Sequence, residues 1–199
     1  MKILIVIDMQ NDFLHGALRN EEGIKIIPAV VKKIEEYKAK NTLVIATRDT
    51  HTEEYLTTQE GQKLPVKHCV KYSYGWRIND EIEKALGECN TYDEKQFPIR
   101  KMQSTAIGAP YTIVFDKPTF GSVDLAKYLG GCYAHIQDKL EIELCGVCTD
   151  ICVISNAMLL KATMPEAKII VNSALCAGVT ISSHERALGA MQSCQIEII

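Results

Sequence analysis

The first eight residues contain a short apolar run that ends abruptly at an acid. The stretch from Ile3 to Ile7 is an uninterrupted series of isoleucine, leucine and valine, and Asp8 follows it directly. A strand that faces solvent on one side alternates apolar and polar residues, whereas a strand covered on both faces is apolar throughout. The run from Lys2 to Asp8 therefore predicts a central strand of a parallel sheet.

Similar runs recur along the chain and alternate with stretches of helical periodicity. Pro28 is expected to open a helix that continues to Lys40, because apolar residues recur there at helical spacing. The other predicted helices are 78–86, 122–129, 150–161 and 182–192. The other predicted strands are 42–47, 112–115, 140–146, 167–171 and 195–199, and 93–101 is predicted as a strand or extended segment.

This alternation of strands and helices predicts an α/β fold. Helices would cover both faces of a mostly parallel, doubly wound sheet in a three-layer α/β/α arrangement. No linker, internal repeat or low-complexity tract interrupts the pattern, so we expect a single domain over residues 1–199.

Composition narrows the class of partner. The 199 residues are 47% hydrophobic and 24% charged with a net charge of −3, which excludes a disordered chain and fits one sizeable core. Because no Lys- or Arg-rich stripe is present, we expect a small-molecule partner and neither nucleic acid nor membrane. The eight cysteines are too sparse for a disulfide scaffold, so we expect free thiols in a reducing cytoplasm.

Polar residues follow four of the predicted strands. Asp8 ends the first strand, 48–51 follow the second, Lys117 follows 112–115, and 148–152 follow 140–146. In open α/β sheets ligands bind beyond the carboxyl ends of the strands, so we expect these four clusters to converge on one edge. The segment 48–73 is long and has no clean period, which predicts a site loop.

Cys152 lies where a strand is predicted to turn into a helix, with Thr149 or Asp150 as the N-cap. The positive end of a helix favours a thiolate, although free cysteines are also often buried and structural. If Asp8 faces Cys152, it can take the thiol proton and return it to a leaving group; the alternative is a loop cap. Lys117 can hold that carboxylate charged and stabilise a thiolate or oxyanion, or it is simply a solvated charge.

One carboxylate and two imidazoles stand in the expected site loop, namely Asp49, His51 and His68. This set suits zinc, or manganese or iron where waters complete an octahedron, whereas histidines at strand ends also cap backbone groups. The pair Cys145 and Cys148 has Cys-x-x-Cys spacing, but Cys145 still belongs to the apolar run and the sequence has no second such pair. A redox pair and a zinc knuckle are therefore disfavoured. The sequence also lacks a glycine-rich phosphate loop.

Five segments, taken in order, resemble the isochorismatase-like cysteine hydrolases, the superfamily that includes the nicotinamidases. They are Val-Ile-Asp-Met-Gln-Asn-Asp-Phe at 6–13, Thr-Arg-Asp-Thr-His at 47–51, Leu-Pro-Val-Lys-His-Cys-Val at 64–70, Lys-Pro-Thr-Phe-Gly-Ser at 117–122, and Gly-Val-Cys-Thr-Asp-Ile-Cys-Val at 146–153. The predicted helix around 183–188 continues the likeness. Each motif alone is weak, but the ordered set is specific.

The resemblance implies a catalytic triad of Asp8, Lys117 and Cys152. Cys152 would attack a carboxamide carbonyl, the backbone N–H groups of Cys148 and Cys152 would receive the oxyanion, and Asp8 would protonate the departing ammonia. Water activated by Asp8 would then hydrolyse the thioester. In the family, the peptide bond before the position of Cys148 is typically cis.

The resemblance also implies a divalent metal on Asp49, His51 and His68, with zinc as the first choice and manganese or iron as alternatives. In nicotinamidases this metal orients the pyridine nitrogen of the substrate. Phe13 would line the pocket for the ring.

Two positions depart from the nicotinamidase pattern. Leu64 stands where these enzymes often carry tryptophan, and 118–122 differ from the Ser-Ala-Phe that often follows their lysine. A missing aromatic wall would weaken the grip on a flat ring, and Trp76 or Tyr74 could supply a substitute.

These expectations predict a metal-containing amidohydrolase. Its first candidate activity is that of a nicotinamidase, which converts nicotinamide and water to nicotinic acid and ammonia through a thioester on Cys152. One alternative is a related cysteine hydrolase acting on another small amide or an N-carbamoyl compound, and another is a non-hydrolytic, cysteine-rich redox or binding protein. The resemblance further implies a homo-oligomer.

Overall fold

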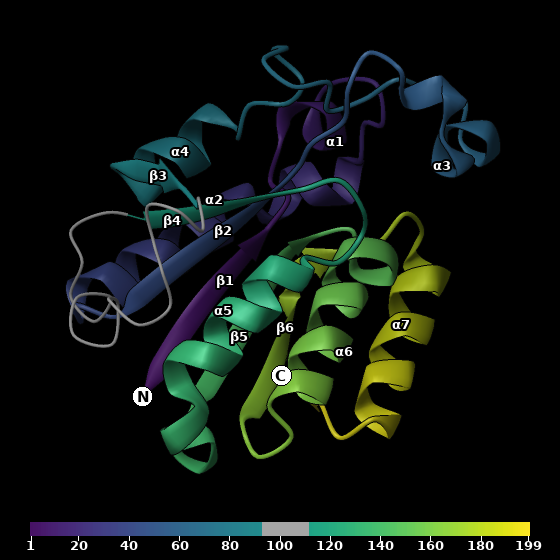
Figure 1. The fold of residues 1–199 in the computed structure, drawn as a ribbon. Helices are drawn as coiled ribbons and strands as arrows, with labels where there is room; N and C mark the ends of the chain where they lie inside the picture. The colour runs from purple at the N-terminus through teal and green to yellow at the C-terminus, as the bar shows by residue number, and fades with distance from the viewer. Residues whose placement is uncertain (93–111) are drawn as a thin grey trace.

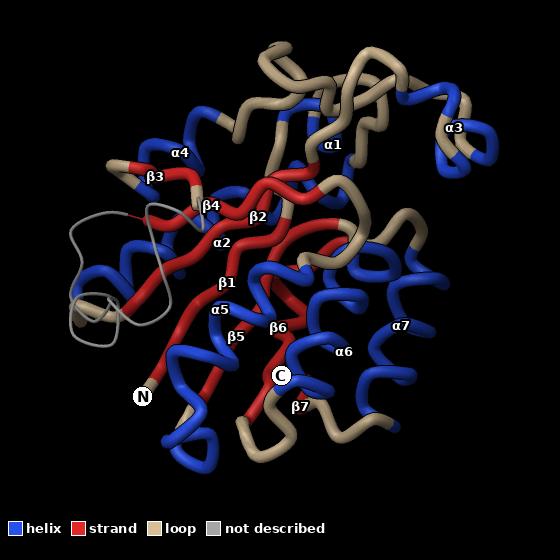
Figure 2. Tube along the Cα trace, viewed as in Figure 1, coloured by secondary structure: helices blue, strands red, loops and turns tan. Residues whose placement is uncertain are grey.

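The computed structural model describes residues 1–92 and 112–199, and their strands form one seven-stranded sheet (Figures 1 and 2). The strands are β1 (Lys2–Ile7), β2 (Leu43–Asp49), β3 (Cys89–Thr91), β4 (Thr112–Lys117), β5 (Glu141–Val147), β6 (Lys168–Ala177) and β7 (Glu197–Ile198). Their order is β3-β4-β2-β1-β5-β6-β7, and every neighbouring pair is parallel. The predicted α/β class and the central position of the first strand are confirmed.

Helices lie on both faces of this sheet. The α-helices are α1 (Asn11–Leu14), α2 (Glu21–Ala39), α3 (Gln59–Lys63), α4 (Asp80–Leu86), α5 (Val123–Tyr133), α6 (Ile154–Thr163) and α7 (Ile181–Ser193). Shorter turns are η1 (Tyr55–Thr57), η3 (Ala134–Lys139) and η4 (Thr149–Val153), of which η4 is π-helical. Helices α5, α6 and α7 cover one face, and α2 and α4 cover the other (Figure 1).

The first strand shows why its sequence is apolar throughout. Ile3, Ile5 and Ile7 pack in the hydrophobic cluster under α5, α6 and α7, whereas Leu4 and Val6 pack in the cluster under α2 and α4. All five side chains are completely or almost completely buried. Successive strand residues point to opposite faces, so a strand covered twice needs apolar residues at every position.

The prediction that a helix opens at Pro28 is wrong. Helix α2 begins seven residues earlier, where the Asn20 side chain caps it by accepting a hydrogen bond from the Gly23 N–H at 3.0 Å. Pro28 lies inside the helix and is exposed. The missing proline N–H removes one hydrogen bond, but the buried stripe that includes Ile27 and Val30 holds the helix against the sheet.

Other boundaries also differ from the sequence-based prediction. The expected site loop contains η1 and α3, β6 is longer and β7 shorter than predicted, and β3 and η3 were not predicted. The predicted extended segment 93–101 lies outside the described residues.

Glycine at position 146 allows β5 to approach the end of β1. Gly146 pairs with Ile7 and has a φ of +119°, and a Cβ atom built on it would lie 2.1 Å from the Ile7 carbonyl oxygen. A larger residue would therefore clash with the backbone just before Asp8. This close approach brings the segment after β5 next to the residue that ends β1.

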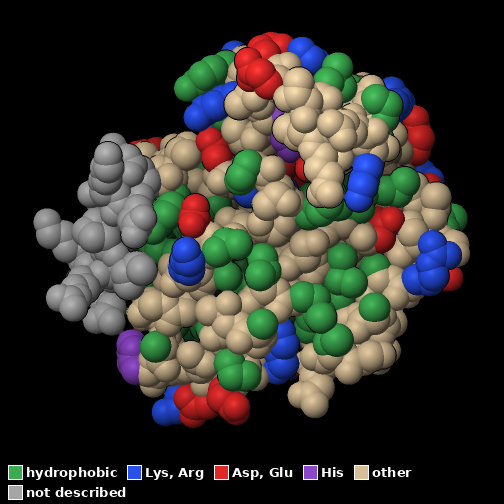
Figure 3. Space-filling view, turned by 45° about the vertical axis from the view of Figure 1, so that its right-hand side comes forward, with side chains coloured by type: hydrophobic (Ala, Val, Ile, Leu, Met, Phe, Trp, Pro, Cys, Tyr) green, Lys and Arg blue, Asp and Glu red, His purple; other side chains and the backbone are tan. Residues whose placement is uncertain are grey.

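The connections after β1 and β5 run to opposite sides of the sheet, so β1 lies at a topological switch point. Within residues 1–92 and 112–199, no helix is long and apolar enough to span a bilayer. The face in Figure 3 carries interspersed acidic and basic side chains, with hydrophobic side chains between them.

Candidate active site

Asp8 and Lys117 form a buried ion pair at the carboxyl edge of the sheet. Asp8 directly follows β1 with a φ of +47°, and Lys117 ends β4. The Lys117 Nζ lies 2.7 Å from Asp8 Oδ2, and neither residue exposes more than 1% of its surface. Thr47, on the strand between them, donates its hydroxyl to Asp8 Oδ1 at 2.7 Å. Both carboxylate oxygens are thus engaged.

Cys152 joins this pair from the other side of β1. It lies in η4, the turn that follows β5, and its Sγ is 3.5 Å from Lys117 Nζ. Lys117 also donates to the Thr119 carbonyl at 3.1 Å and to Asp49 Oδ1 at 3.3 Å. The structure therefore brings together the acid, the lysine and the cysteine that the sequence singled out, and Lys117 contacts both of the others.

Burial dominates the protonation of this group. It raises the pKa of the Cys152 thiol well above its ordinary value, and the nearby Lys117 ammonium only partly opposes this. Burial likewise raises the pKa of Asp8, again against Lys117. Burial disfavours the charged form of Lys117 too, but Asp8, Cys152 and Asp49 outweigh it and raise the lysine pKa.

Burial of the thiol therefore opposes the thiolate that the sequence led us to expect at this turn. Cys152 is 5% exposed, and loss of solvent disfavours its anion. A neutral thiol needs a base to become a nucleophile. Asp8 interacts with this thiol, and its own pKa is raised, so it is the candidate base.

The turn that carries Cys152 is held from outside rather than by an N-cap side chain. Cys148 occupies the N-cap position, without a capping hydrogen bond from its side chain, so the prediction of Thr149 or Asp150 as the cap is wrong. Thr149 Oγ1 lies 2.8 Å from His184 Nδ1 on α7, and Asp150 Oδ1 accepts the Val179 N–H at 3.0 Å. The Val147–Cys148 peptide bond is cis, as expected from the family resemblance.

Asn156 on α6 was missed in the sequence. Its Nδ2 donates to the Cys152 carbonyl at 2.8 Å and to the Phe120 carbonyl at 3.2 Å, and its Oδ1 accepts the Ser122 N–H at 2.9 Å. Asn156 is 1% exposed, so these bonds satisfy a buried amide and tie the cysteine turn to the segment after Lys117. An amide within an otherwise apolar helix face was the available signal.

The three predicted metal ligands also converge. Asp49 Oδ2 lies 2.9 Å from His51 Nε2 and 3.5 Å from His68 Nε2, and all three residues are buried. His68 Nδ1 lies 2.8 Å from the Val66 carbonyl, an arrangement that directs Nε2 toward the carboxylate. One ligand atom from each residue lies within 4.8 Å of the others. Two imidazoles and a carboxylate in this arrangement fit a divalent metal such as zinc.

Two more residues belong to this cluster and were not predicted. Glu60 on α3 places Oε1 3.7 Å from His51 Nε2 and 4.0 Å from His68 Nε2. Gln10 holds the backbone of Asp49 through both its amide atoms, because its Oε1 accepts the Asp49 N–H at 2.7 Å and its Nε2 donates to the Asp49 carbonyl at 2.8 Å. Glu60 was a carboxylate between two candidate ligands in the sequence, but nothing in the spacing indicated that α3 turns it inward.

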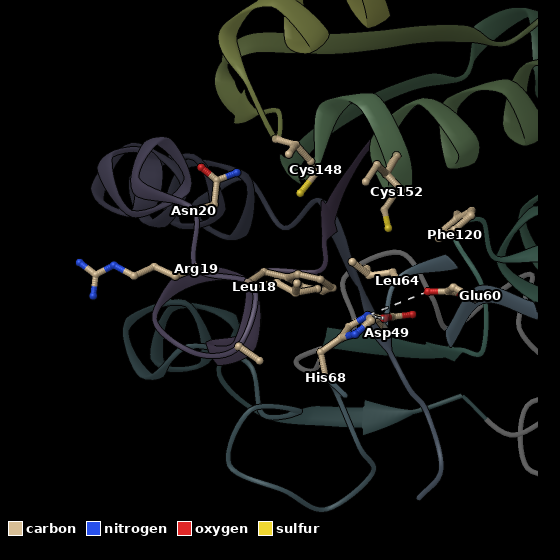
Figure 4. Close-up of a pocket in the computed structure, with 14 residues that line it drawn as sticks. Leu18, Arg19, Asn20, Asp49, Glu60, Leu64, His68, Phe120, Cys148 and Cys152 are labelled. Atoms are coloured by element: carbon tan, nitrogen blue, oxygen red, sulfur yellow. Dashed lines mark ion pairs between the residues drawn. The ribbon is translucent and has the colours of Figure 1, made fainter. Parts of the chain in front are cut away.

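A cavity of about 570 Å³ lies between the turn that carries Cys152 and the candidate metal site of Asp49, His51 and His68. Cys148 and Cys152 enter it from one wall, and Asp49 and His68 lie at the opposite wall (Figure 4). Phe13 lines this cavity, as predicted, and its ring centroid is 5.7 Å from that of His68.

The structure does not place Tyr74 or Trp76 at the position of the aromatic wall that the sequence led us to expect. Within the described part of the chain, neither Tyr74 nor Trp76 lines the cavity. Trp76 instead stacks beneath the Arg48 guanidinium and donates its indole N–H to Thr50 at 2.8 Å. Phe120, together with Phe13, supplies the aromatic lining.

Comparison with known proteins agrees with this architecture. Residues 2–97 match the Isochorismatase domain model. The chain is 26% identical to the nicotinamidase of Saccharomyces cerevisiae over 79% of its length and 80% of that protein, and 26% identical to the nicotinamidase of Schizosaccharomyces pombe over 98% and 91%. The crystal structure of the pyrazinamidase of Pyrococcus horikoshii in complex with zinc superposes with a TM-score of 0.71 at 28% identity, covering 100% of this chain and 98% of that one.

Fold and site thus define an α/β protein with a candidate Asp-Lys-Cys group beside a candidate metal cluster. The chain is thus similar to the Isochorismatase domain over residues 2–97 and to two nicotinamidases over most of its length.

Proposed function

We propose that this chain is a cysteine-dependent amidohydrolase, and that nicotinamide is its first candidate substrate. The observation that carries the proposal is the contact of Lys117 with both Asp8 and Cys152, because Cys152 lines a cavity that Asp49 and His68 also line. The similarity to two nicotinamidases and to a zinc-containing pyrazinamidase supports the same chemistry.

In the first step, Cys152 Sγ attacks the carboxamide carbon while Asp8 takes the thiol proton. The raised pKa of Asp8 suits it to hold that proton, and the Lys117 ammonium stabilises the negative charge that passes between the carboxylate and the sulfur. The backbone N–H groups of Cys148 and Cys152 are proposed to donate to the oxyanion.

In the second step, the C–N bond breaks and Asp8 gives its proton to the departing nitrogen, which leaves as ammonia. The acyl group remains on Cys152 as a thioester. Asp8, again a carboxylate, then takes a proton from water as the water oxygen attacks the thioester. The carboxylic acid leaves, and the proton returns to the sulfur.

Asp49, His51 and His68 are proposed to hold a divalent metal, with zinc as the first choice and manganese or iron as alternatives. When bound, such an ion would supply a Lewis acid that orients a ring nitrogen of the substrate. Phe13 is proposed to contact the ring itself, because it lines the cavity next to His68.

The direct test is ammonia release from nicotinamide by the metal-loaded protein. We expect turnover in the wild type and none above background in Cys152→Ala, with full turnover in Cys132→Ala, which truncates another buried cysteine on α5. Retained turnover in Cys152→Ala would contradict the mechanism. A panel with other small amides and N-carbamoyl compounds separates nicotinamide from the alternative substrates.

Three broader features are proposed from the sequence and the family resemblance. We propose that residues 1–199 form a single domain, that the protein works in the reducing cytoplasm, and that it assembles as a homo-oligomer. The eight cysteines are too few for a disulfide scaffold, which supports a reducing environment. Size-exclusion chromatography with light scattering measures the assembly directly.

A further inference from the structure

The cavity is larger than the substrate proposed for it. Its volume of about 570 Å³ lies within the range of roughly 300–1,000 Å³ that accommodates drug-sized ligands. Nicotinamide is one six-membered ring with a carboxamide, so it would fill only part of this space. The chemistry of the remaining lining indicates what else the cavity can take.

Three apolar side chains form the rim of the cavity. Leu64 follows α3, Phe120 follows β4, and Val179 follows β6, and they are 38%, 43% and 59% exposed, respectively. They come from separate loops of the chain. Exposed apolar side chains around an opening are a feature of ligand-binding grooves.

The backbone of each rim residue is fixed by a hydrogen bond to the surrounding structure. The Leu64 carbonyl accepts the Tyr55 hydroxyl at 3.1 Å, and the Phe120 carbonyl accepts Asn156 Nδ2 at 3.2 Å. The Val179 N–H donates to Asp150 Oδ1 at 3.0 Å. Two of these partners belong to the cysteine turn or to the helix that continues it, so the rim is positioned relative to Cys152.

Two polar residues that line the cavity, Asn20 and Arg19, form hydrogen bonds with other parts of the protein. The Asn20 side chain accepts the Gly23 N–H and donates to the Gly178 carbonyl at 2.8 Å. Arg19 Nε donates to Glu21 at 2.7 Å. Leu18, together with the rim residues Leu64, Phe120 and Val179, gives the cavity an apolar lining away from the reacting amide.

We infer that the preferred substrates are aromatic carboxamides that carry an apolar substituent on the ring. This inference rests on the proposed amidohydrolase function and assigns the substrate class of the same site. The carboxamide reaches Cys152, the ring lies against Phe13, and the substituent covers Leu64, Phe120 and Val179. Burying that exposed apolar surface would stabilise the bound substrate beyond what nicotinamide achieves.

The test compares kcat/KM for nicotinamide with that for 5-phenylnicotinamide and 6-phenylnicotinamide in the metal-loaded wild type. We expect the better of the two phenyl compounds to exceed nicotinamide by at least threefold. A ratio below threefold, with nicotinamide hydrolysed, overturns the inference and leaves the proposed function standing. Absence of ammonia release from all three amides overturns both.

Rim variants test where the preference originates. Leu64→Asn and Val179→Asn, which make two separate loops polar with little change in size, should each lower the phenyl-to-nicotinamide ratio at least threefold. Leu56→Asn is the matched control, because Leu56 is a 44% exposed leucine of the same segment that does not line the cavity, and its ratio should equal that of the wild type. An unchanged ratio in both rim variants overturns the inference.

Discussion

Replacing Asp8 by asparagine removes the proposed base while nearly preserving the shape of the side chain. The variant amide can still accept the Thr47 hydroxyl, which lies 2.7 Å from Asp8 Oδ1. It cannot take a proton from the neutral, buried thiol of Cys152. General acid–base catalysis contributes about 10²–10⁴-fold to rate. Because Asp8 is proposed to act in both halves of the reaction, we expect ammonia release to fall by about 10³-fold or more.

The same substitution should destabilise the fold by a limited amount. Removing one partner of a buried ion pair typically costs about 3–5 kcal/mol. Lys117 keeps the Asp49 carboxylate at 3.3 Å and the Thr119 carbonyl at 3.1 Å, and burial already disfavours a charged Asp8. We therefore expect a loss at the low end of that range, about 3 kcal/mol.

Two assays separate these effects. Ammonia release under saturating nicotinamide measures the catalytic loss, and urea unfolding measures stability, with Asp124→Asn, an exposed carboxylate in the first turn of α5, as the control. A folded Asp8→Asn protein whose turnover stays within tenfold of the wild type would refute the assignment of Asp8 as the base.

Three further outcomes follow from the site. Burial raises the pKa of Asp8 above the ordinary carboxyl value of 3.8, and the proposed base must be deprotonated to act. As pH decreases, kcat/KM should therefore fall with an inflection above pH 3.8. An inflection at or below pH 3.8 would argue against Asp8 as the base. Prolonged chelation should reduce turnover of nicotinamide and added zinc should restore it, whereas His51→Ala should respond to neither; turnover indifferent to chelation would exclude a required metal. Asn156→Ala should lower kcat about tenfold or more with a smaller change in KM. The reason is that Asn156 positions Cys152 and the segment after Lys117 but does not line the cavity. A change confined to KM in steady-state kinetics would contradict this role.

The fold and the convergence of the site could be predicted from local patterns. An apolar run such as Ile3 to Ile7 can only be buried on both faces, and the carboxyl ends of parallel strands meet at one edge. The rule therefore predicted that Asp8, Asp49, Lys117 and the turn of Cys152 lie close together. The structure shows Lys117 in contact with the other three. Pattern alone left their roles open, and the ordered family resemblance supplied them.

The features that could not be predicted depend on tertiary contacts. Burial of the thiol raises the pKa of Cys152, and the position of α3 in the fold brings Glu60 within 3.7 Å of His51. The predicted helix start at Pro28 was wrong because α2 continues through this proline. Burial of Ile27 and Val30 stabilises a helix that proline alone would disfavour. The aromatic lining comes from Phe13 and Phe120, and neither Tyr74 nor Trp76 lines the cavity.

Cys152 is proposed to carry the acyl group of the substrate during turnover. Rapid mixing with nicotinamide, acid quenching and intact-mass analysis test it most directly, since acid traps a thioester before hydrolysis. We expect a mass increase of one nicotinoyl group that maps to the peptide containing Cys152 and is absent in Cys152→Ala. Turnover of nicotinamide with no adduct in the wild type, or with an adduct on another residue, would contradict it.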